Sequence, residues 1–289
     1  MRATVNSGRD KMTEYLQIDN QRIAYDAAGS PSNPPIILVH GLMSHRGVWT
    51  RTVESLKDDF FCIVPDLLGF GESDKPDNGD YTIAKQAERI LKIADHFGFD
   101  NFIIIGHSMG GQVATYLAAN LAPQRIHKLV SVDGVVTGKL SDRAQKFNRS
   151  LVLLAEKIPA LYDLSFELGQ LWKPLAYWIF QVWFYQIKEV SFDSWKLDRR
   201  MALNPEVAQS GRKAWDSLNS TDLRSSLKNI AAPTIVIFGR QDGTVPIEQA
   251  YLFKEKLSAA QLVVIDECGH FPMYQKFDEY IKSLQEFLG

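Results

Sequence analysis

The sequence is poor in the features that mark disulfide-rich, metal-binding and membrane-spanning proteins. Its 289 residues include two cysteines, Cys62 and Cys268, which form neither a disulfide framework nor a zinc-ligand pattern. No two histidines or carboxylates have the spacing of metal ligands, and no apolar run approaches the roughly 18 residues of a transmembrane helix. We therefore expect no metal, no cofactor and no stable membrane insertion.

An excess of one charge is also lacking. Lysine and arginine number 32 against 34 acidic residues, the net charge is −2, and no basic block stands out. Nucleic acid is therefore not an expected partner. Residues 1–11 are polar, lack the apolar core of a signal peptide and are expected to be poorly ordered. These features predict a cytoplasmic protein, and they leave its oligomeric state open.

Short apolar runs alternate with helical segments through the first 134 residues. After an expected hairpin over 16–25, strands are predicted at 35–39, 60–64, 101–105 and 126–132, and again at 233–238 and 261–265. Helices are predicted at 48–56, 82–97, 247–257 and 274–288. This alternation predicts an α/β fold whose parallel sheet has helices on both faces.

Residues 135–223 interrupt that alternation, because helices but no strands are predicted there. Five of the six tryptophans lie there, namely Trp172, Trp178, Trp183, Trp195 and Trp215. We predict a core formed by residues 1–134 and 224–289, with residues 135–223 inserted as a helical cap. The aromatic side chains between 161 and 185 pack the cap's own small core and also make the wall of a pocket apolar.

Residues 106–111, Gly-His-Ser-Met-Gly-Gly, join the strand at 101–105 to a helix. Ser108 is thus predicted on a sharp strand-to-helix turn with glycine two residues before and after it, the pattern of a nucleophile elbow. Small neighbours tolerate the strained backbone of such a turn. A glycine-rich turn that merely connects two elements is the alternative, so the other loops must decide.

Candidate partners for Ser108 follow other predicted strands. Asp242 follows the strand at 233–238, and His270 follows the strand at 261–265. Parallel strands bring their carboxyl ends to one edge of a sheet, and the chain order Ser108, Asp242, His270 is the one expected for this kind of elbow. The pattern predicts a catalytic triad. Asp133, which ends the strand at 126–132, is the alternative acid.

The loop that follows the strand at 35–39 begins His40-Gly41-Leu42. The backbone N–H groups of Leu42 and Met109 are predicted to form an oxyanion hole, because a glycine allows close approach and a helix N-terminus offers free donors. We expect the His40 side chain to be structural rather than catalytic. The histidines away from strand ends, His45, His96 and His127, are expected to be solvated.

Several of these segments together resemble the α/β-hydrolase fold family over nearly the whole chain, residues 15–289. They are His40-Gly41, Asp66-Leu67-Leu68-Gly69-Phe70-Gly71-Glu72-Ser73, the elbow at 106–111, the loop 239–246 and Gly269-His270. The resemblance implies a sheet of eight mostly parallel strands and a cap or lid formed by the insertion. Dehalogenases and epoxide hydrolases of this fold use an aspartate nucleophile, so Ser108 favours the branch of carboxylesterases and lipases.

A triad of this kind predicts hydrolysis of carboxylic esters through an acyl-serine. The aromatic cap favours small-molecule esters with apolar short- to medium-chain acyl or aromatic groups, with Trp172, Trp178 and Phe271 as candidate substrate contacts. A C–C bond hydrolase or lactonase with the same triad is the alternative enzyme, and it would need polar pocket groups such as Arg240 or Lys173. A ligand receptor on a hydrolase fold is the non-enzymatic alternative.

Overall fold

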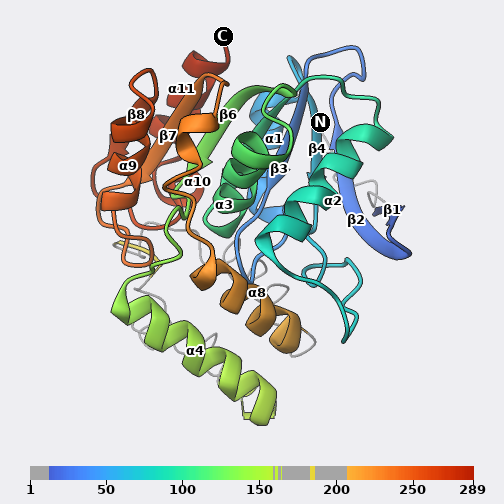
Figure 1. Ribbon diagram of the computed structural model, residues 1–289, viewed down its shortest axis with the longest axis vertical. Helices are drawn as coiled ribbons and strands as arrows, with labels where there is room; N and C mark the ends of the chain where they lie inside the picture. Colours follow the sequence, from blue (N-terminus) through green and yellow to red (C-terminus); the bar gives the residue numbers. More distant parts are fainter. Residues whose placement is uncertain (1–12, 159, 162–163, 165–182, 186–206) are drawn as a thin grey trace, which may run out of the picture.

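The computed structural model of the protein describes residues 13–158, 160–161, 164, 183–185 and 207–289. Its centre is an eight-stranded sheet with the order β1-β2-β4-β3-β5-β6-β7-β8 (Figure 1). The strands are β1 (Glu14–Ile18), β2 (Gln21–Ala28), β3 (Pro35–Val39), β4 (Phe61–Pro65), β5 (Phe102–His107), β6 (Ile126–Val132), β7 (Thr234–Gly239) and β8 (Gln261–Ile265). Strand β2 runs antiparallel to β1 and β4, and the other neighbours are parallel. The predicted mostly parallel sheet is confirmed.

Strands β1 and β2 form the predicted hairpin. Ile18 pairs with Gln21, and the two residues between them, Asp19 and Asn20, have φ angles of 54° and 61°. Two consecutive positive φ angles belong to a tight turn whose twist matches that of the flanking strands, and Asp and Asn tolerate this conformation.

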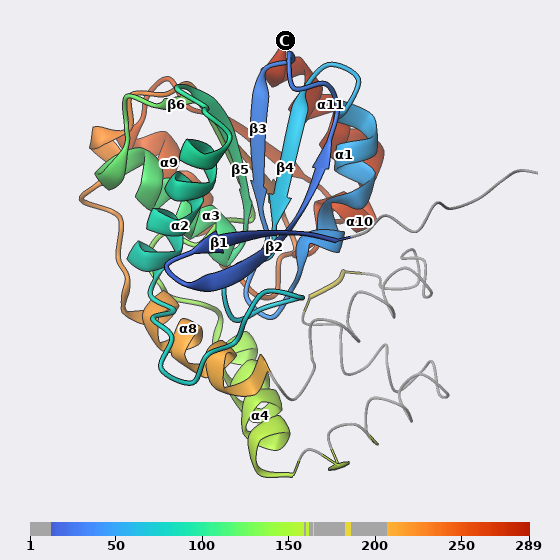
Figure 2. The same ribbon diagram turned by 90° about the vertical axis from the view of Figure 1, so that its right-hand side faces the viewer.

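Helices lie on both faces of the sheet (Figures 1 and 2). One face carries α2 (Ile83–His96), α3 (Met109–Tyr116) and α9 (Glu248–Lys256), and the other carries α1 (Thr50–Leu56) and α11 (Phe277–Leu288). The central strands β3 to β7 are therefore covered on both sides, and their side chains are mostly buried. Because both faces of these strands are buried, their successive side chains are apolar, and the strands appear in the sequence as continuous apolar runs.

Helix α2 shows how the local sequence sets the boundaries of an element. Thr82 caps its start, since the Thr82 hydroxyl accepts a hydrogen bond from the Lys85 N–H at 3.3 Å. Its buried stripe consists of Ile83, Ala87, Ile90, Ile93 and Ala94. Each buried isoleucine stabilises the packing by about 1.5–3 kcal/mol. The helix ends at His96, and the chain leaves it through Gly98, whose positive φ of 69° is a conformation that glycine adopts readily.

Two helices differ from the prediction. The segment expected as one helix at 48–56 begins as a 3-10 helix, Arg46–Trp49, before α1. The segment expected at 274–288 is split into α10 (Pro272–Gln275) and α11 by Lys276, whose φ of −132° and ψ of 54° are not helical. The split leaves α10 free to direct Gln275 toward the loop before it, where its side chain accepts a hydrogen bond from the Gly269 N–H at 2.8 Å.

The segment between β6 and β7 contains α4 (Asp142–Lys157) and α8 (Ala208–Ser220), which lie side by side beyond one end of the sheet (Figures 1 and 2). The Ser217 hydroxyl of α8 accepts a hydrogen bond from the Ile83 N–H at 2.9 Å, which joins this helix to the start of α2. Trp172 and Trp178 lie outside the described residues. Among the described helices, none combines the length and apolarity needed to span a membrane.

Candidate active site

Ser108 occupies the turn between β5 and α3 with a φ of 55° and a ψ of −118°. This backbone conformation is strained for a residue with a side chain. The neighbouring glycines make it possible, because a Cβ on Gly106 would lie 2.2 Å from the Gly110 carbonyl oxygen, and one on Gly110 would lie 2.2 Å from the Val39 carbonyl oxygen. The glycine spacing that singled out Ser108 in the sequence is thus required by close backbone packing.

The three predicted triad residues converge at the end of the sheet. The His270 Nε2 atom lies 2.9 Å from the Ser108 hydroxyl, and the His270 Nδ1 atom lies 2.7 Å from an Asp242 carboxylate oxygen. The other Asp242 oxygen accepts hydrogen bonds from the Thr244 and Val245 N–H groups at 2.7 and 3.1 Å. With Asp242 as acceptor, the proton of the neutral imidazole lies on Nδ1, so Nε2 is free to accept the serine proton.

The backbone of His270 is fixed from two directions. Its N–H donates to the Trp183 carbonyl at 2.8 Å, and its carbonyl accepts a hydrogen bond from His107 Nε2 at 2.7 Å. His107 belongs to the elbow strand, whereas Trp183 comes from the segment between β6 and β7. The loop of His270 is therefore attached both to the nucleophile turn and to the predicted cap.

The predicted oxyanion donors flank Ser108. Met109 is the first residue of α3, and Leu42 follows Gly41, where a Cβ would lie only 3.0 Å from the Ser108 Cβ. Glycine at position 41 thus lets this loop lie against the elbow. Within the described part of the chain, neither the Leu42 N–H nor the Met109 N–H has an acceptor. Both donors remain available for an oxyanion.

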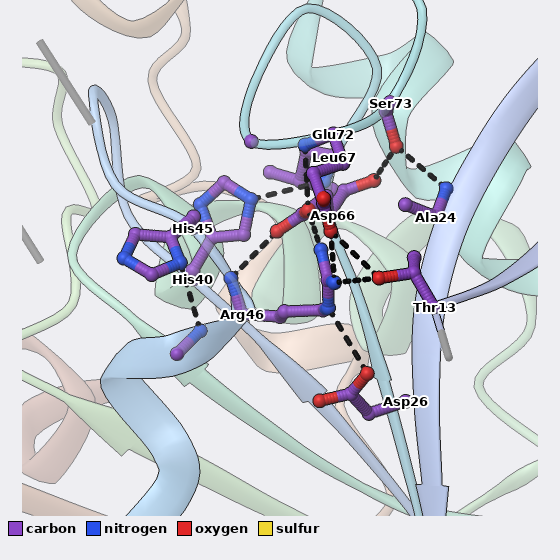
Figure 3. Close-up of polar contacts among 12 residues, drawn as sticks. Thr13, Ala24, Asp26, His40, His45, Arg46, Asp66, Leu67, Glu72 and Ser73 are labelled. Carbon is purple, nitrogen blue, oxygen red and sulfur yellow. Dashed lines mark hydrogen bonds and ion pairs between the residues drawn. The ribbon is translucent and has the colours of Figure 1, made fainter. Parts of the chain in front are cut away.

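Buried His40 lies beside Leu67 (Figure 3) and fixes the direction of the Leu42 N–H. His40 Nε2 accepts a hydrogen bond from the Leu67 N–H at 2.9 Å, so the ring proton lies on Nδ1 and is donated to the Gly41 carbonyl at 2.8 Å. The Gly41 carbonyl and the Leu42 N–H are opposite ends of one trans peptide unit. Holding the carbonyl toward His40 therefore holds the N–H in the opposite direction.

Arg46 joins the loops that follow β3 and β4 (Figure 3). Its guanidinium contacts the Asp66 and Glu72 carboxylates, lies 3.1 Å from Asp26 and donates to the Thr13 hydroxyl at 2.9 Å. Its backbone N–H also donates to Asp66, at 2.6 Å. We call these five residues the Arg46 cluster. It is a structural feature that the sequence analysis missed, although Asp66 and Glu72 lie within one of the motif segments.

Charges in the Arg46 cluster support one another. Burial by itself would lower the pKa of Arg46, but the charges of Asp66, Asp26 and Glu72 outweigh it and raise that pKa above its ordinary value. The hydrogen bond from Arg46 in turn lowers the pKa of Glu72. Both shifts favour the charged forms of Arg46 and Glu72, whose ion pair joins the two loops.

Asp133, the alternative acid, lies next to Asp242. It ends β6 with a φ of 43°, is fully buried and accepts a hydrogen bond from the Gly239 N–H at 2.8 Å. The bond to His270 Nδ1 comes from Asp242, which therefore holds the orienting position. Burial and the adjacent charge of Asp242 raise the pKa of Asp133 well above its ordinary value.

A metal ion has no evident place among these groups. Asp133, Asp242 and His270 each have one possible ligand atom within 4.8 Å of those of the other two. Two of the three residues are already hydrogen-bonded to each other, and their geometry is that of a triad rather than of a ligand set.

A cavity lies above Ser108. Its walls are formed by Gly41, Leu42, Met43, Ser44, His107, Leu140, Trp183, Leu218, Thr244, His270 and Phe271. Phe271, a predicted substrate contact, lies in this wall and stacks on Phe184 with ring centroids 5.2 Å apart. Leu140 and Leu218 were not predicted to line it, because nothing in their local sequence distinguishes them from other buried leucines.

The prediction that His45 is solvated is wrong. His45 is buried, and its Nδ1 atom accepts a hydrogen bond from the Gly47 N–H at 3.1 Å, which caps the 3-10 helix before α1. His96 and His127 are exposed, as expected. The reason for the difference is that the loop containing His45 is folded back against the Arg46 cluster.

Comparison with known proteins identifies the family. The family defined by the alpha/beta hydrolase fold matches residues 34–277. The chain belongs to that family. Within this hydrolase family, the protein is 30% identical to the pimeloyl-[acyl-carrier protein] methyl ester esterase of Vibrio parahaemolyticus over 88% of this chain and 94% of the esterase. It is 26% identical to lipase 1 of Psychrobacter immobilis over 92% of this chain and 80% of the lipase.

A solved structure with a different named activity shows the same fold. The 2-hydroxy-6-oxo-6-phenylhexa-2,4-dienoate hydrolase of Rhodococcus sp. strain RHA1 superposes with a TM-score of 0.78, covering 96% of this chain and 98% of that one. The two sequences are 23% identical, so this likeness extends to the fold alone. The named esterase and lipase relatives are carboxylic ester hydrolases, in agreement with the enzyme class expected from the sequence.

Proposed function

We propose that the protein is a serine hydrolase that cleaves carboxylic esters through an acyl-serine. The observation that carries this proposal is the continuous hydrogen-bonded chain from the Ser108 hydroxyl through His270 to Asp242. This chain supplies a nucleophile, a base and a group that orients the base. The esterase and lipase relatives support the same class of reaction.

In the proposed reaction, Ser108 Oγ attacks the ester carbonyl while His270 Nε2 takes its proton. The carbonyl oxygen becomes an oxyanion that accepts hydrogen bonds from the Leu42 and Met109 N–H groups, each worth about 3 kcal/mol to the transition state in comparable sites. His270 returns the proton to the leaving alkoxide, and the alcohol departs. A water molecule, deprotonated by His270, then attacks the acyl-serine; the bond to Ser108 Oγ breaks, His270 gives the proton to Ser108 Oγ, and the acid is released. Asp242 remains ionised throughout and stabilises the imidazolium.

Apolar side chains favour an uncharged acyl or aromatic group as the substrate part that enters the cavity. Leu140, Trp183, Leu218 and Phe271 contribute apolar surface to its wall, and none of the described wall residues is a lysine or an arginine. Arg240, considered for a substrate with a second carboxylate, is instead exposed and paired with Asp266. These features support short- to medium-chain or aromatic esters over a C–C substrate or lactone that has a further carboxylate.

The predicted cap of residues 135–223 belongs to the same proposal. Its support is the position of α4 and α8 outside the sheet, together with the contribution of Leu140, Trp183 and Leu218 to the cavity wall. The predicted contacts of Trp172 and Trp178 with substrate, and the cytoplasmic location, remain predictions from the sequence.

The test is hydrolysis of p-nitrophenyl esters from acetate to palmitate by the wild type and by Ser108→Ala. We expect Ser108→Ala to lower kcat/KM by about 10⁴-fold or more, and the wild type to prefer short to medium chains. Ser283→Ala, which removes a hydroxyl from the exposed side of α11, is the matched control and should retain full activity. If the wild type is no faster than Ser108→Ala on any ester, the proposal fails, and C–C substrates, lactones and ligand binding become the next assays.

A further inference from the structure

Two carboxyl groups are buried together behind the predicted base. Asp133 is fully buried at the end of β6, and the side chain of Asp242 is fully buried in the loop after β7. An oxygen of each lies within 4.8 Å of the other and of a ring nitrogen of His270. Ionisation of both carboxyl groups is disfavoured when they are buried this close together, and burial and the charge of Asp242 raise the pKa of Asp133 well above its ordinary value. This arrangement favours one proton shared by the pair.

The hydrogen bonds show which carboxyl is charged. Among the described residues, Asp242 accepts hydrogen bonds from the Thr244 and Val245 N–H groups and from His270 Nδ1. Asp133 accepts one from the Gly239 N–H, and no donor among those residues reaches its second oxygen. A side-chain hydrogen bond with Asp242 contributes to the raised pKa of Asp133. Because donors stabilise the ionised form of the group that accepts them, Asp242 is favoured as the carboxylate, and the second oxygen of Asp133 is left to carry the proton.

No cation competes for this pair in the part of the chain that the structure describes. Neither Asp133 nor Asp242 forms an ion pair with a lysine or arginine there. The other titratable groups that face the pair are His270 and Cys268. Burial, with a further contribution from Asp133 and Asp242, raises the pKa of the Cys268 thiol, which stays neutral. The proton of Asp133 thus has the Asp242 carboxylate as its acceptor.

We propose that Asp133 is a positioning residue that keeps the proton of this pair and donates a hydrogen bond to Asp242, so that the pair presents a single negative charge to His270. This role rests on the proposed function of Asp242. The backbone of Asp133, with its positive φ, and the Gly239 N–H hold the donor in place. The donor in turn restrains the carboxylate plane of Asp242 in the direction of His270 Nδ1.

Carbon-13 NMR of wild-type protein labelled at aspartate Cγ tests the protonation state without reference to activity. We expect one aspartate carboxyl to be protonated at pH 7. Its resonance should be missing from Asp133→Asn, whereas in Asp242→Asn it should remain and titrate at lower pH. A spectrum in which every aspartate is ionised at pH 7 overturns the proposal, as does a protonated resonance that Asp242→Asn removes. Because no substrate is involved, this result is independent of whether the protein hydrolyses esters.

Kinetics of two substitutions at the same position test the positioning role. Asparagine can still donate to Asp242 and accept from the Gly239 N–H, whereas alanine can do neither. We expect Asp133→Ala to lower kcat on the best ester by about 100-fold, the scale of a misplaced catalytic group. The kcat of Asp133→Asn should be at least about tenfold higher than that of Asp133→Ala, and KM should be similar in both variants. Equal kcat values for the two variants, or no loss in either, would show that Asp133 does not position Asp242.

Discussion

The two sides of Ser108 are stabilised in different ways. On the oxyanion side, the loops that follow β3 and β4 are joined by Arg46, which is surrounded by carboxylates (Figure 3). On the acid side, the loops that follow β6, β7 and β8 are joined by backbone N–H groups and by the pair of Asp133 and Asp242, with no lysine or arginine paired to either in the described residues.

This difference matches what each side does in the proposed reaction. The oxyanion side must hold two neutral N–H groups in a fixed direction, so its supporting carboxylates can be paired with an arginine without affecting those donors. The acid side must stabilise a positive charge that forms on His270, and an arginine beside Asp242 would have neutralised the carboxylate before that charge appeared. Backbone donors restrain Asp242 without cancelling its charge.

The largest effect is expected when the acid side loses its charge. Asp242→Asn keeps the shape of the side chain, but its amide can donate to His270 Nδ1 and so favour the wrong tautomer. We expect kcat/KM on the best p-nitrophenyl ester to fall by about 10⁴-fold with the fold intact by circular dichroism. Asp266→Asn, in the exposed ion pair with Arg240, is the matched control and should retain activity. A loss below tenfold would mean that Asp242 does not orient the base.

The next effect concerns the stability of the oxyanion side. Arg46→Met removes the cation but leaves the fully buried Asp66 carboxylate without its charged partner. We expect the free energy of unfolding, measured by urea denaturation at pH 7, to fall by about 3–5 kcal/mol. In Arg224→Met, which breaks an exposed pair with Asp222, the fall should be below about 1 kcal/mol. Similar losses in the two variants would remove the contrast between the two sides of the site.

A smaller loss of activity is expected when His40 is substituted, because His40 is not one of the three predicted triad residues. His40→Ala frees the Gly41 carbonyl and thereby the direction of the Leu42 N–H. We expect kcat to fall by about 10- to 100-fold, less than complete loss of one oxyanion donor, with KM little changed. Affinity for a boronic acid that mimics the tetrahedral intermediate should fall in parallel. The exposed His96→Ala is the control, and an equal change in KM and kcat would point to a general structural defect instead.

The smallest effect is a difference in how stability depends on pH. The pKa of Asp133 is raised in the folded state, so the wild type has the full stability of this group below the unfolded pKa of about 3.9 and loses part of it as the pH rises toward the folded value. Asp133→Asn does not titrate. Relative to wild type, its free energy of unfolding should therefore rise between pH 4 and pH 7, by about 1.4 kcal/mol for each pH unit over which Asp133 is protonated in the folded state but not in the unfolded state. A constant difference over this range would argue against a proton on Asp133.

Much of the site could be predicted from the sequence because each predicted triad residue lies in the loop or turn that follows its own strand. A parallel sheet brings such positions to one edge whatever their separation along the chain, and this rule sufficed for Ser108, Asp242 and His270. The same rule placed Asp133 there. The rule could not show that Asp133 and Asp242 lie side by side, and the sequence therefore offered them as alternative acids. Their proximity depends on the register between β6 and β7 and on the course of the loop after β7.

The Arg46 cluster could not be predicted for a similar reason. Its members come from four separate segments between Thr13 and Glu72, and they meet only because β2 lies beside β4 in antiparallel register. A charged residue in a loop ordinarily faces solvent, so neither the burial of Arg46 nor that of His45 follows from the local sequence. The break at Lys276 that separates α10 from α11 could not be predicted either, because the sequence on both sides of it is compatible with one continuous helix.

The bond between the His270 N–H and the Trp183 carbonyl has a consequence for how this enzyme could change over evolutionary time. A main-chain acceptor is present whatever side chain occupies position 183. Substitutions of the Trp183 side chain can therefore reshape the cavity wall while His270, the predicted base, keeps its hydrogen bond to the main chain of the segment between β6 and β7. Single mutations at position 183 can therefore change selectivity for the acyl group of the proposed substrates. The side chain of this residue forms part of the cavity wall, whereas its main-chain carbonyl holds His270.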